Sequence, residues 1–170
     1  MMKNLSQEKG QAIVLFALAA IGLIAFAALA IDGGRVFSDR RHAQNAADSA
    51  ALAVALSLAR APEGADYLQI ATDAATESAA INGYVDKNEV TNDVIVKLTE
   101  ARDARRECNG AYHGTDAQVT IVSTIDTTLA RVIGRNQVTN RVSAWARFCH
   151  PVIDINTGTV LQPGSVTMLK

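Results

Sequence analysis

One uncharged apolar run constrains this chain more than any other feature. The 20 residues from Ala12 to Ile31 include no charged side chain, and the run ends at Asp32. As a helix, 20 residues span about 30 Å, the thickness of the hydrocarbon core of a membrane. A helix buried in a soluble domain is rarely apolar on all sides over that length. We therefore predict a transmembrane helix over residues 11–31, preceded by a short cytoplasmic tail, residues 1–10.

A cleaved signal peptide is the main alternative to a retained anchor. Lys3 and Lys9 give the N-terminus a basic character, and small residues at Ala25–Ala27 and Ala28–Ala30 resemble cleavage sites. The apolar region of a signal peptide is usually shorter, about 7–15 residues. The length of the run therefore favours a retained anchor, and the intact mass of the protein would distinguish the two.

The two cysteines indicate on which side of the membrane the rest of the chain lies. Cys108 and Cys149 both follow the apolar run. In an oxidising compartment they would close a loop worth about 4 kcal/mol in the chain-entropy model. This favours a single-pass protein of the cytoplasmic (inner) membrane whose C-terminal domain lies outside the cytoplasm. Two alternatives remain: free thiols in a cytosolic domain, or a zinc site that also uses His113 and His150.

We predict an Ala-rich helix outside the membrane for residues 32–62. It continues the predicted span, so that one helix runs from about Gly10 to Arg60, unless Gly33 and Gly34 form a hinge. Residues four apart share one face of a helix, so alanines at this spacing form a smooth packing face. This face packs either against the chain's own domain or against partner subunits and copies of the chain. Its members are Ala43, Ala47, Ala51, Ala55 and Ala59, and the nearby Asp39, Arg40, Arg41 and Asp48 are expected to be solvated.

Residues 63–170 predict a small exported α+β domain. A second helix is expected over residues 63–82, ended by Gly83. A short helix is expected over 127–134. The β-branched and alternating segments predict an antiparallel sheet of three to four strands lying against the helices outside the membrane. The expected strands are residues 94–98, 118–125 and 137–149, with a fourth near 152–155.

The N-terminal segment resembles the TadE/TadG-like proteins of tight-adherence (Flp) pilus assembly. The features that carry this resemblance are Gly10-Gln11 before the apolar run, Asp32 and Arg35 after it, and the run Gln44–Ala53. We take Gly10, Gln11, Asp32 and Arg35 as the membrane boundary. The resemblance implies an envelope protein linked to a pilus or secretion apparatus. The chain departs from pilins of this broad class, which carry Glu at the fifth position after the cleavage-site Gly, because Leu15 stands there.

No pattern in the sequence predicts an enzyme. Motifs for nucleophilic, metal-dependent or phosphate-binding chemistry are absent from the sequence, and we assign no catalytic residue, metal or cofactor. The balanced charge, with 16 basic and 17 acidic residues, gives no basic footprint for nucleic acid. The expected function is therefore tethering and helix packing, with membrane lipid and other assembly proteins or copies of the chain as partners. The alternative is a membrane-tethered or secreted module that binds cell-wall glycan, with Tyr112, Trp145 and Phe148 as contact residues.

Overall fold

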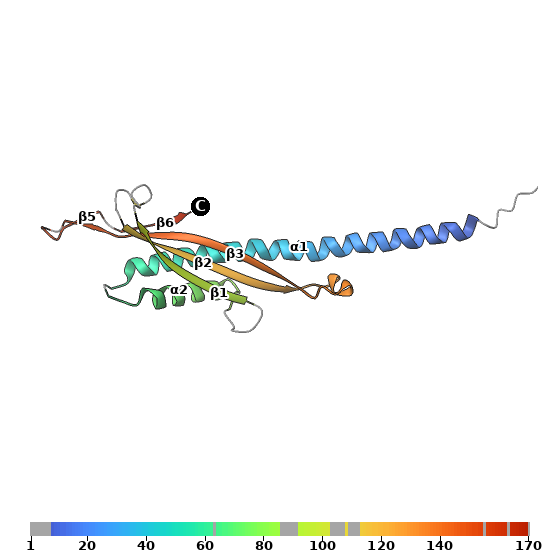
Figure 1. Cartoon of the computed structure of the whole chain (residues 1–170), viewed down its shortest axis with the longest axis horizontal. Coiled ribbons are helices and arrows are strands. Elements are labelled where there is room, and N and C mark those ends of the chain that lie inside the picture. Colours follow the sequence, from blue (N-terminus) through green and yellow to red (C-terminus); the bar gives the residue numbers. More distant parts are fainter. Residues whose placement is uncertain are drawn as a thin grey trace, which may run out of the picture. The chain divides into compact units, whose positions relative to one another are not determined.

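The computed structural model describes residues 8–62, 64–85, 92–102, 108, 113–154, 156–162 and 164–169. These residues form two α-helices, a short 3₁₀-helix and six strands (Figure 1). The structure confirms the α+β fold with a long apolar N-terminal helix and a four-stranded antiparallel sheet. In chain order the elements are α1 (Glu8–Arg60), α2 (Tyr67–Ile81), β1 (Asn92–Arg102), β2 (His113–Asp126), η1 (Ala130–Ile133), β3 (Gln137–Cys149), β4 (Val152–Ile153), β5 (Val160–Gln162) and β6 (Ser165–Leu169).

Helix α1 is continuous through Gly33 and Gly34, so the predicted single helix is confirmed and the hinge is not seen. Each glycine costs about 1 kcal/mol relative to alanine in a helix. The long flanking runs of Ala, Leu and Arg are strong helix formers, and they outweigh this cost.

Helix α2 begins four residues later than predicted, because Asp66 acts as its N-cap. The Asp66 carboxylate accepts hydrogen bonds from the backbone N–H groups of Leu68 and Gln69, at 3.1 Å each. Such a cap fixes the start of a helix by satisfying N–H groups that have no partner within it. At the other end Asn82 is the C-cap and Gly83 follows with a φ of 86°, as the predicted stop requires.

The main sheet has the strand order β1-β2-β3-β6. Strand β3 has the predicted bounds, whereas β1 and β2 are longer than predicted. Their antiparallel pairing runs from Asn92↔Ser123 to Arg102↔His113 and so continues through polar residues that the apolar alternation does not mark.

The fourth strand of this sheet is β6, so the prediction of a fourth strand near residues 152–155 is wrong in position. Strand β4 lies in that region but pairs with β5 in a separate two-stranded sheet. Strand β6 pairs with β3 from Trp145↔Leu169 to Cys149↔Ser165. A Cβ atom at Gly164 would lie 2.9 Å from the carbonyl oxygen of Cys149, so only glycine permits this close approach just before β6.

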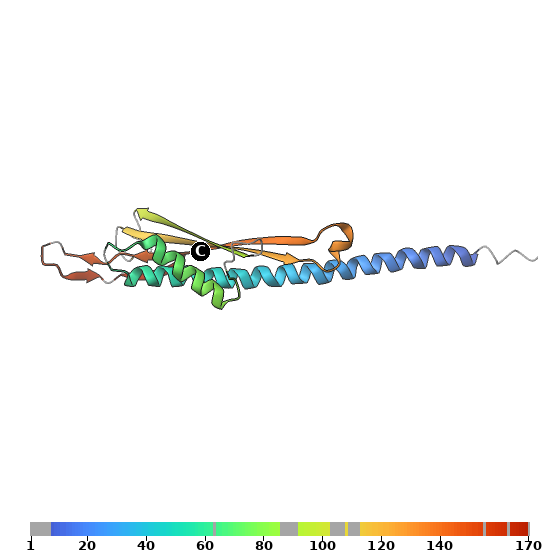
Figure 2. The same cartoon turned by 90° about the horizontal axis from the view of Figure 1, so that it is seen from below.

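The chain divides into two compact units. One comprises residues 1–38 and 126–138, and the other comprises residues 39–125 and 139–170. In the second unit, α2 and its part of α1 lie on one face of the main sheet (Figure 2). The core between these layers consists largely of alanine, and its largest fully buried side chains are Ile121, Val54, Val119 and Cys149.

Candidate functional site

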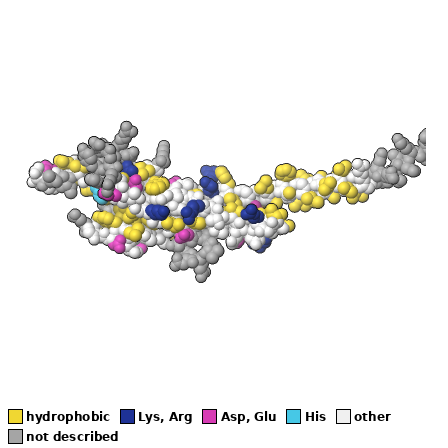
Figure 3. Space-filling model, viewed as in Figure 1, with side chains coloured by type: hydrophobic (Ala, Val, Ile, Leu, Met, Phe, Trp, Pro, Cys, Tyr) yellow, Lys and Arg dark blue, Asp and Glu magenta, His cyan; other side chains and the backbone are white. Residues whose placement is uncertain are grey.

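The apolar part of α1 is exposed along its length. Ile13, Phe16 and Phe26 are 70%, 78% and 75% exposed, and none of the most apolar window of this helix is buried (Figure 3). A helix of this length and composition can cross a membrane. The core helix of a soluble domain would bury such side chains, so their exposure favours a surrounding that is itself apolar.

Asp32, the first charged residue after the apolar run, binds the turn between β2 and β3. Its Oδ1 accepts a hydrogen bond from the N–H of Thr128 at 2.9 Å, and its Oδ2 accepts from the N–H groups of Leu129 at 2.9 Å and Ala130 at 2.7 Å. The hydrogen bond from Ala130, followed by that from Thr128, lowers the pKa of Asp32. Arg35 adds a hydrogen bond from its Nη1 to the Thr128 hydroxyl at 2.5 Å. Two of the four residues predicted to mark the membrane boundary, Asp32 and Arg35, thus hold a turn that is far away in sequence.

One signal for this contact is visible in the sequence. The N–H groups at the start of a short helix have no partner within it, so residues 128–130 require an external acceptor. Sequence alone does not indicate which acceptor supplies it, because Asp32 lies 96 residues before Thr128. The position of the membrane boundary itself, at Gly10, Gln11, Asp32 and Arg35, stays a prediction.

Asp39 is the centre of a polar network, and the expectation that it is solvated is wrong. Its Oδ1 accepts hydrogen bonds from the hydroxyls of Tyr84 and Ser123, both at 3.1 Å, and its Oδ2 accepts from Asn140 Nδ2 at 2.8 Å. Burial, and then the nearby Asp39 carboxylate, raise the pKa of Tyr84. The spacing in the sequence is a signal for this role, because Asp39 lies four residues before Ala43 and so continues the face that α1 buries.

The alanine face of α1 packs within the chain. Ala43, Ala47, Ala51 and Ala55 are completely buried, together with Ala71, Ala75 and Ala79 of α2. Of the two alternatives for this face, the structure thus shows packing against the chain's own domain for these four residues. Ala59 is exposed and is the member that a partner could reach.

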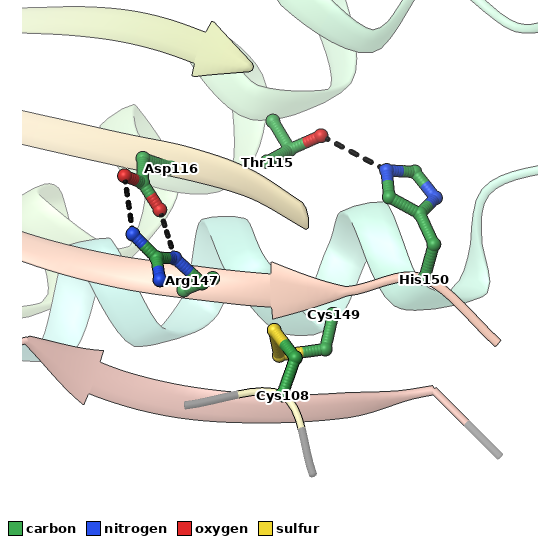
Figure 4. Close-up of a disulfide and its surroundings, with 6 residues drawn as sticks. All are labelled: Cys108, Thr115, Asp116, Arg147, Cys149 and His150. Atoms are coloured by element: carbon green, nitrogen blue, oxygen red, sulfur yellow. Dashed lines mark hydrogen bonds and ion pairs between the residues drawn. A yellow bond between two sulfur atoms is a disulfide. The ribbon is translucent and has the colours of Figure 1, made fainter. Parts of the chain in front are cut away.

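Cys108 and Cys149 form a disulfide, with their Cα atoms 5.3 Å apart (Figure 4). Both sulfurs are used in this bond, so neither is available as a thiolate ligand for the zinc site considered as an alternative. Near the disulfide, Arg147 Nη2 donates to Asp116 Oδ2 at 2.9 Å and Arg147 Nε donates to Asp116 Oδ1 at 2.5 Å. His150 Nε2 lies 3.2 Å from the hydroxyl of Thr115. The side chain of His113 lies outside the described residues.

The described residues give the glycan-binding alternative no support. The shallow depression lined by Leu58, Tyr67, Thr115, Phe148 and His150 has no interior space for even a water molecule, whereas ligand pockets usually measure about 300–1,000 Å³. Phe148 is buried in the core, while Trp145 is 38% exposed and, three residues earlier on β3, points to the other face of the sheet. Tyr112 lies outside the described residues. In the part of the chain that the structure describes, no three His, Cys, Asp or Glu side chains are placed to hold a metal ion.

Comparison with known families gives a match to the N-terminal segment. Residues 10–61 match the Tad family, described as "Putative Flp pilus-assembly TadE/G-like". The matched segment contains the whole apolar run and nearly all of the rest of α1, and it confirms the resemblance that Gly10-Gln11, Asp32 and Arg35 carry. It covers less than a third of the 170 residues. No curated protein and no solved structure matches the chain.

Proposed function

We propose that this protein is a membrane-anchored structural component of a Tad (Flp) pilus or a related secretion apparatus. The Tad match supports a role related to pilus assembly, and it spans the segment that would be embedded in the membrane. It also supports a structural role over a catalytic one, because the matched family is described by assembly.

One observation carries this proposal: two parts of a single unbroken helix require different surroundings, an apolar medium for one and the protein core for the other. From Ala12 to Ile31 α1 is apolar and exposed, which is stable only in an apolar surrounding. From Ala43 to Leu58 the same helix contributes buried side chains to the core under the sheet. A helix built in this way tethers a folded domain to a membrane. The mechanism we propose is therefore tethering and packing, without bond chemistry.

The proposed location is the cytoplasmic (inner) membrane, with residues 1–10 inside the cell and the sheet domain outside the cytoplasm. The disulfide supports this orientation, because disulfides persist in oxidising compartments and are rare in the cytosol. The proposed partners are membrane lipid and other assembly proteins of the apparatus or copies of the chain.

Two measurements on the full-length protein test the anchoring. We expect the protein to stay in the membrane fraction after carbonate extraction and to keep its intact mass, with residues 11–31 present. We also expect alkaline phosphatase fused after the sheet domain to be active, since this reporter works only outside the cytoplasm. A protein released by carbonate, or a mature form that starts near Ile31, would show that the apolar run is not a retained anchor.

A genetic experiment tests the role in assembly. Deleting the gene in the source organism should remove pili, counted by electron microscopy, and the wild-type gene should restore them. A matched variant carries an unrelated apolar helix of equal length in place of residues 12–31. Restoration by this variant would show that the span acts as a tether only, and failure would show that its own surface contacts partners. Normal piliation in the deletion strain would refute the role in pilus assembly.

A further inference from the structure

The turn between β2 and β3 exposes an apolar tip. Val132 and Ile133 of η1 are 88% and 81% exposed, more than any other large apolar side chain in the part of the chain that the structure describes. The turn is well defined, because Gly134 closes η1 with a φ of 84° and its N–H donates to the carbonyl of Arg131 at 3.0 Å. Two large aliphatic side chains at the end of an ordered turn favour a contact that covers them.

The tip is tied to the end of the apolar run. The Asp32 carboxylate accepts three backbone hydrogen bonds from residues 128–130, which lie two to four residues before Val132. Arg35 binds the Thr128 hydroxyl from the next turn of α1. These residues all belong to one compact unit, residues 1–38 and 126–138. If residues 12–31 occupy the hydrocarbon core, Asp32 lies at its edge, and the turn that Asp32 holds lies at the level of the lipid headgroups.

The charges beside the tip suit anionic lipid. Arg131 and Arg135 flank Val132 and Ile133 and are exposed, and Arg35 is exposed on the adjacent helix. The carboxylate at the base of the turn, Asp126, accepts a hydrogen bond from Gln137 Nε2 at 3.0 Å. Aliphatic side chains between cations are typical of segments that lie in a membrane interface, with the apolar groups among the acyl chains and the cations among the phosphates.

We propose that residues 126–138, which we name the interfacial turn, form a second membrane contact. Val132 and Ile133 insert at the boundary between headgroups and acyl chains, and Arg131 and Arg135 bind anionic headgroups. The inference rests on the proposed membrane anchoring. Continuity with the apolar run is the reason to choose lipid as the occupant over a protein, which becomes an outcome of the test.

Tryptophan quenching in vesicles tests the proposal on the full chain. Trp145 is the only tryptophan, so Trp145→Phe gives a background without tryptophan emission. Single tryptophans are then placed by Val132→Trp in the interfacial turn, by Phe26→Trp in the apolar run, and by Leu161→Trp in β5. Leu161 is the matched control, because it is also apolar and is 62% exposed, but belongs to the other unit. The vesicles contain phosphatidylcholine and phosphatidylglycerol, with bromine placed either near the headgroup or deep in one acyl chain.

We expect the tryptophan at position 132 to lose most of its emission to shallow bromine and little to deep bromine. The tryptophan at position 26 should be quenched by deep bromine, and that at position 161 by neither. Adding Ile133→Asp to Val132→Trp should reduce shallow quenching, and adding Arg131→Glu with Arg135→Glu should reduce it in vesicles with phosphatidylglycerol. Neither change removes a hydrogen bond to Asp32, because those bonds come from the backbone of residues 128–130.

The failures of the two proposals are distinguishable. Quenching at position 26 without quenching at position 132 would refute the interfacial turn and leave the anchor intact. No quenching at position 26 would refute the anchor, and with it the inference. A blue-shifted emission at position 132 that bromine does not quench would show that a protein surface covers the tip instead of lipid. Equal quenching at positions 132 and 161 would show general adsorption to vesicles and would also overturn the inference.

Discussion

Replacing the buried Ala51 by leucine should destabilise the domain, whereas the same replacement at Ala59, at the exposed end of the same helix face, should not. Ala51 of α1 is completely buried in the core, whereas Ala59 is exposed two helical turns later. Ala51→Leu adds three carbon atoms to a close-packed interior, where overpacking typically costs about 1–3 kcal/mol. Ala59→Leu adds the same atoms in solvent, where surface substitutions change stability by about 0.5 kcal/mol or less. Leucine and alanine are both good helix formers, so helix propensity cancels in the comparison.

Thermal unfolding of the full-length protein in detergent, followed by near-ultraviolet circular dichroism, measures the difference. In a domain of this size about 1 kcal/mol corresponds to about 4 °C in Tm, so Ala51→Leu should lower Tm by about 4–12 °C. Ala59→Leu should leave Tm within about 2 °C of the wild type. Equal Tm values for the two variants would refute the argument, because they would show that the alanine face is not packed against the chain's own core.

Four further outcomes follow from the contacts. Reducing the disulfide, whose cysteines are 41 residues apart, should lower the free energy of unfolding by about 4 kcal/mol, measured by urea titration with and without reductant. Asp32→Asn should increase hydrogen exchange of the Ala130 amide. In the wild type, hydrogen bonds lower the Asp32 pKa, so protection of this amide from exchange should persist above pH about 4 and decline as pH falls through that lowered pKa. Asp39→Ala should lower the free energy of unfolding by about 3 kcal/mol in urea titration, because it leaves buried donors unsatisfied. Since the Tyr84 pKa is raised, stability should be level below pH about 10 and decrease as pH rises further, and Tyr84→Phe should remove this decrease.

Local sequence patterns predicted the elements whose extent follows from the residues within the element itself. The alternation along residues 137–149 predicted β3 at both ends, and in the structure one of the two alternating sets, which includes Val142 and Ala146, is buried. The apolar run and the strong helix formers after it predicted α1. In these segments, propensity and burial pattern point to the same structure.

Contacts between distant segments could not be predicted in this way. Strand β6 contains two polar residues among five, and its pairing depends on the close approach that Gly164 permits. Asp32 was identified as the end of the apolar run, but its carboxylate binds a turn about a hundred residues later. Asp39 was expected to be solvated because it is charged, yet three donors, from two strands and the segment after α2, satisfy it. Such roles depend on which partners the fold brings together, and a polar residue gives no local sign of them.

The composition of the alanine face matters while the protein is being synthesised. Helix α1 contributes this face early in the chain, whereas the strands that cover it come from residues 92–149. The alanine face of the helix therefore remains uncovered until these strands have been synthesised. Methyl side chains offer little apolar area to chaperones or neighbouring chains during that time. A face of alanine thus lowers the risk of aggregation that a face of leucine would carry.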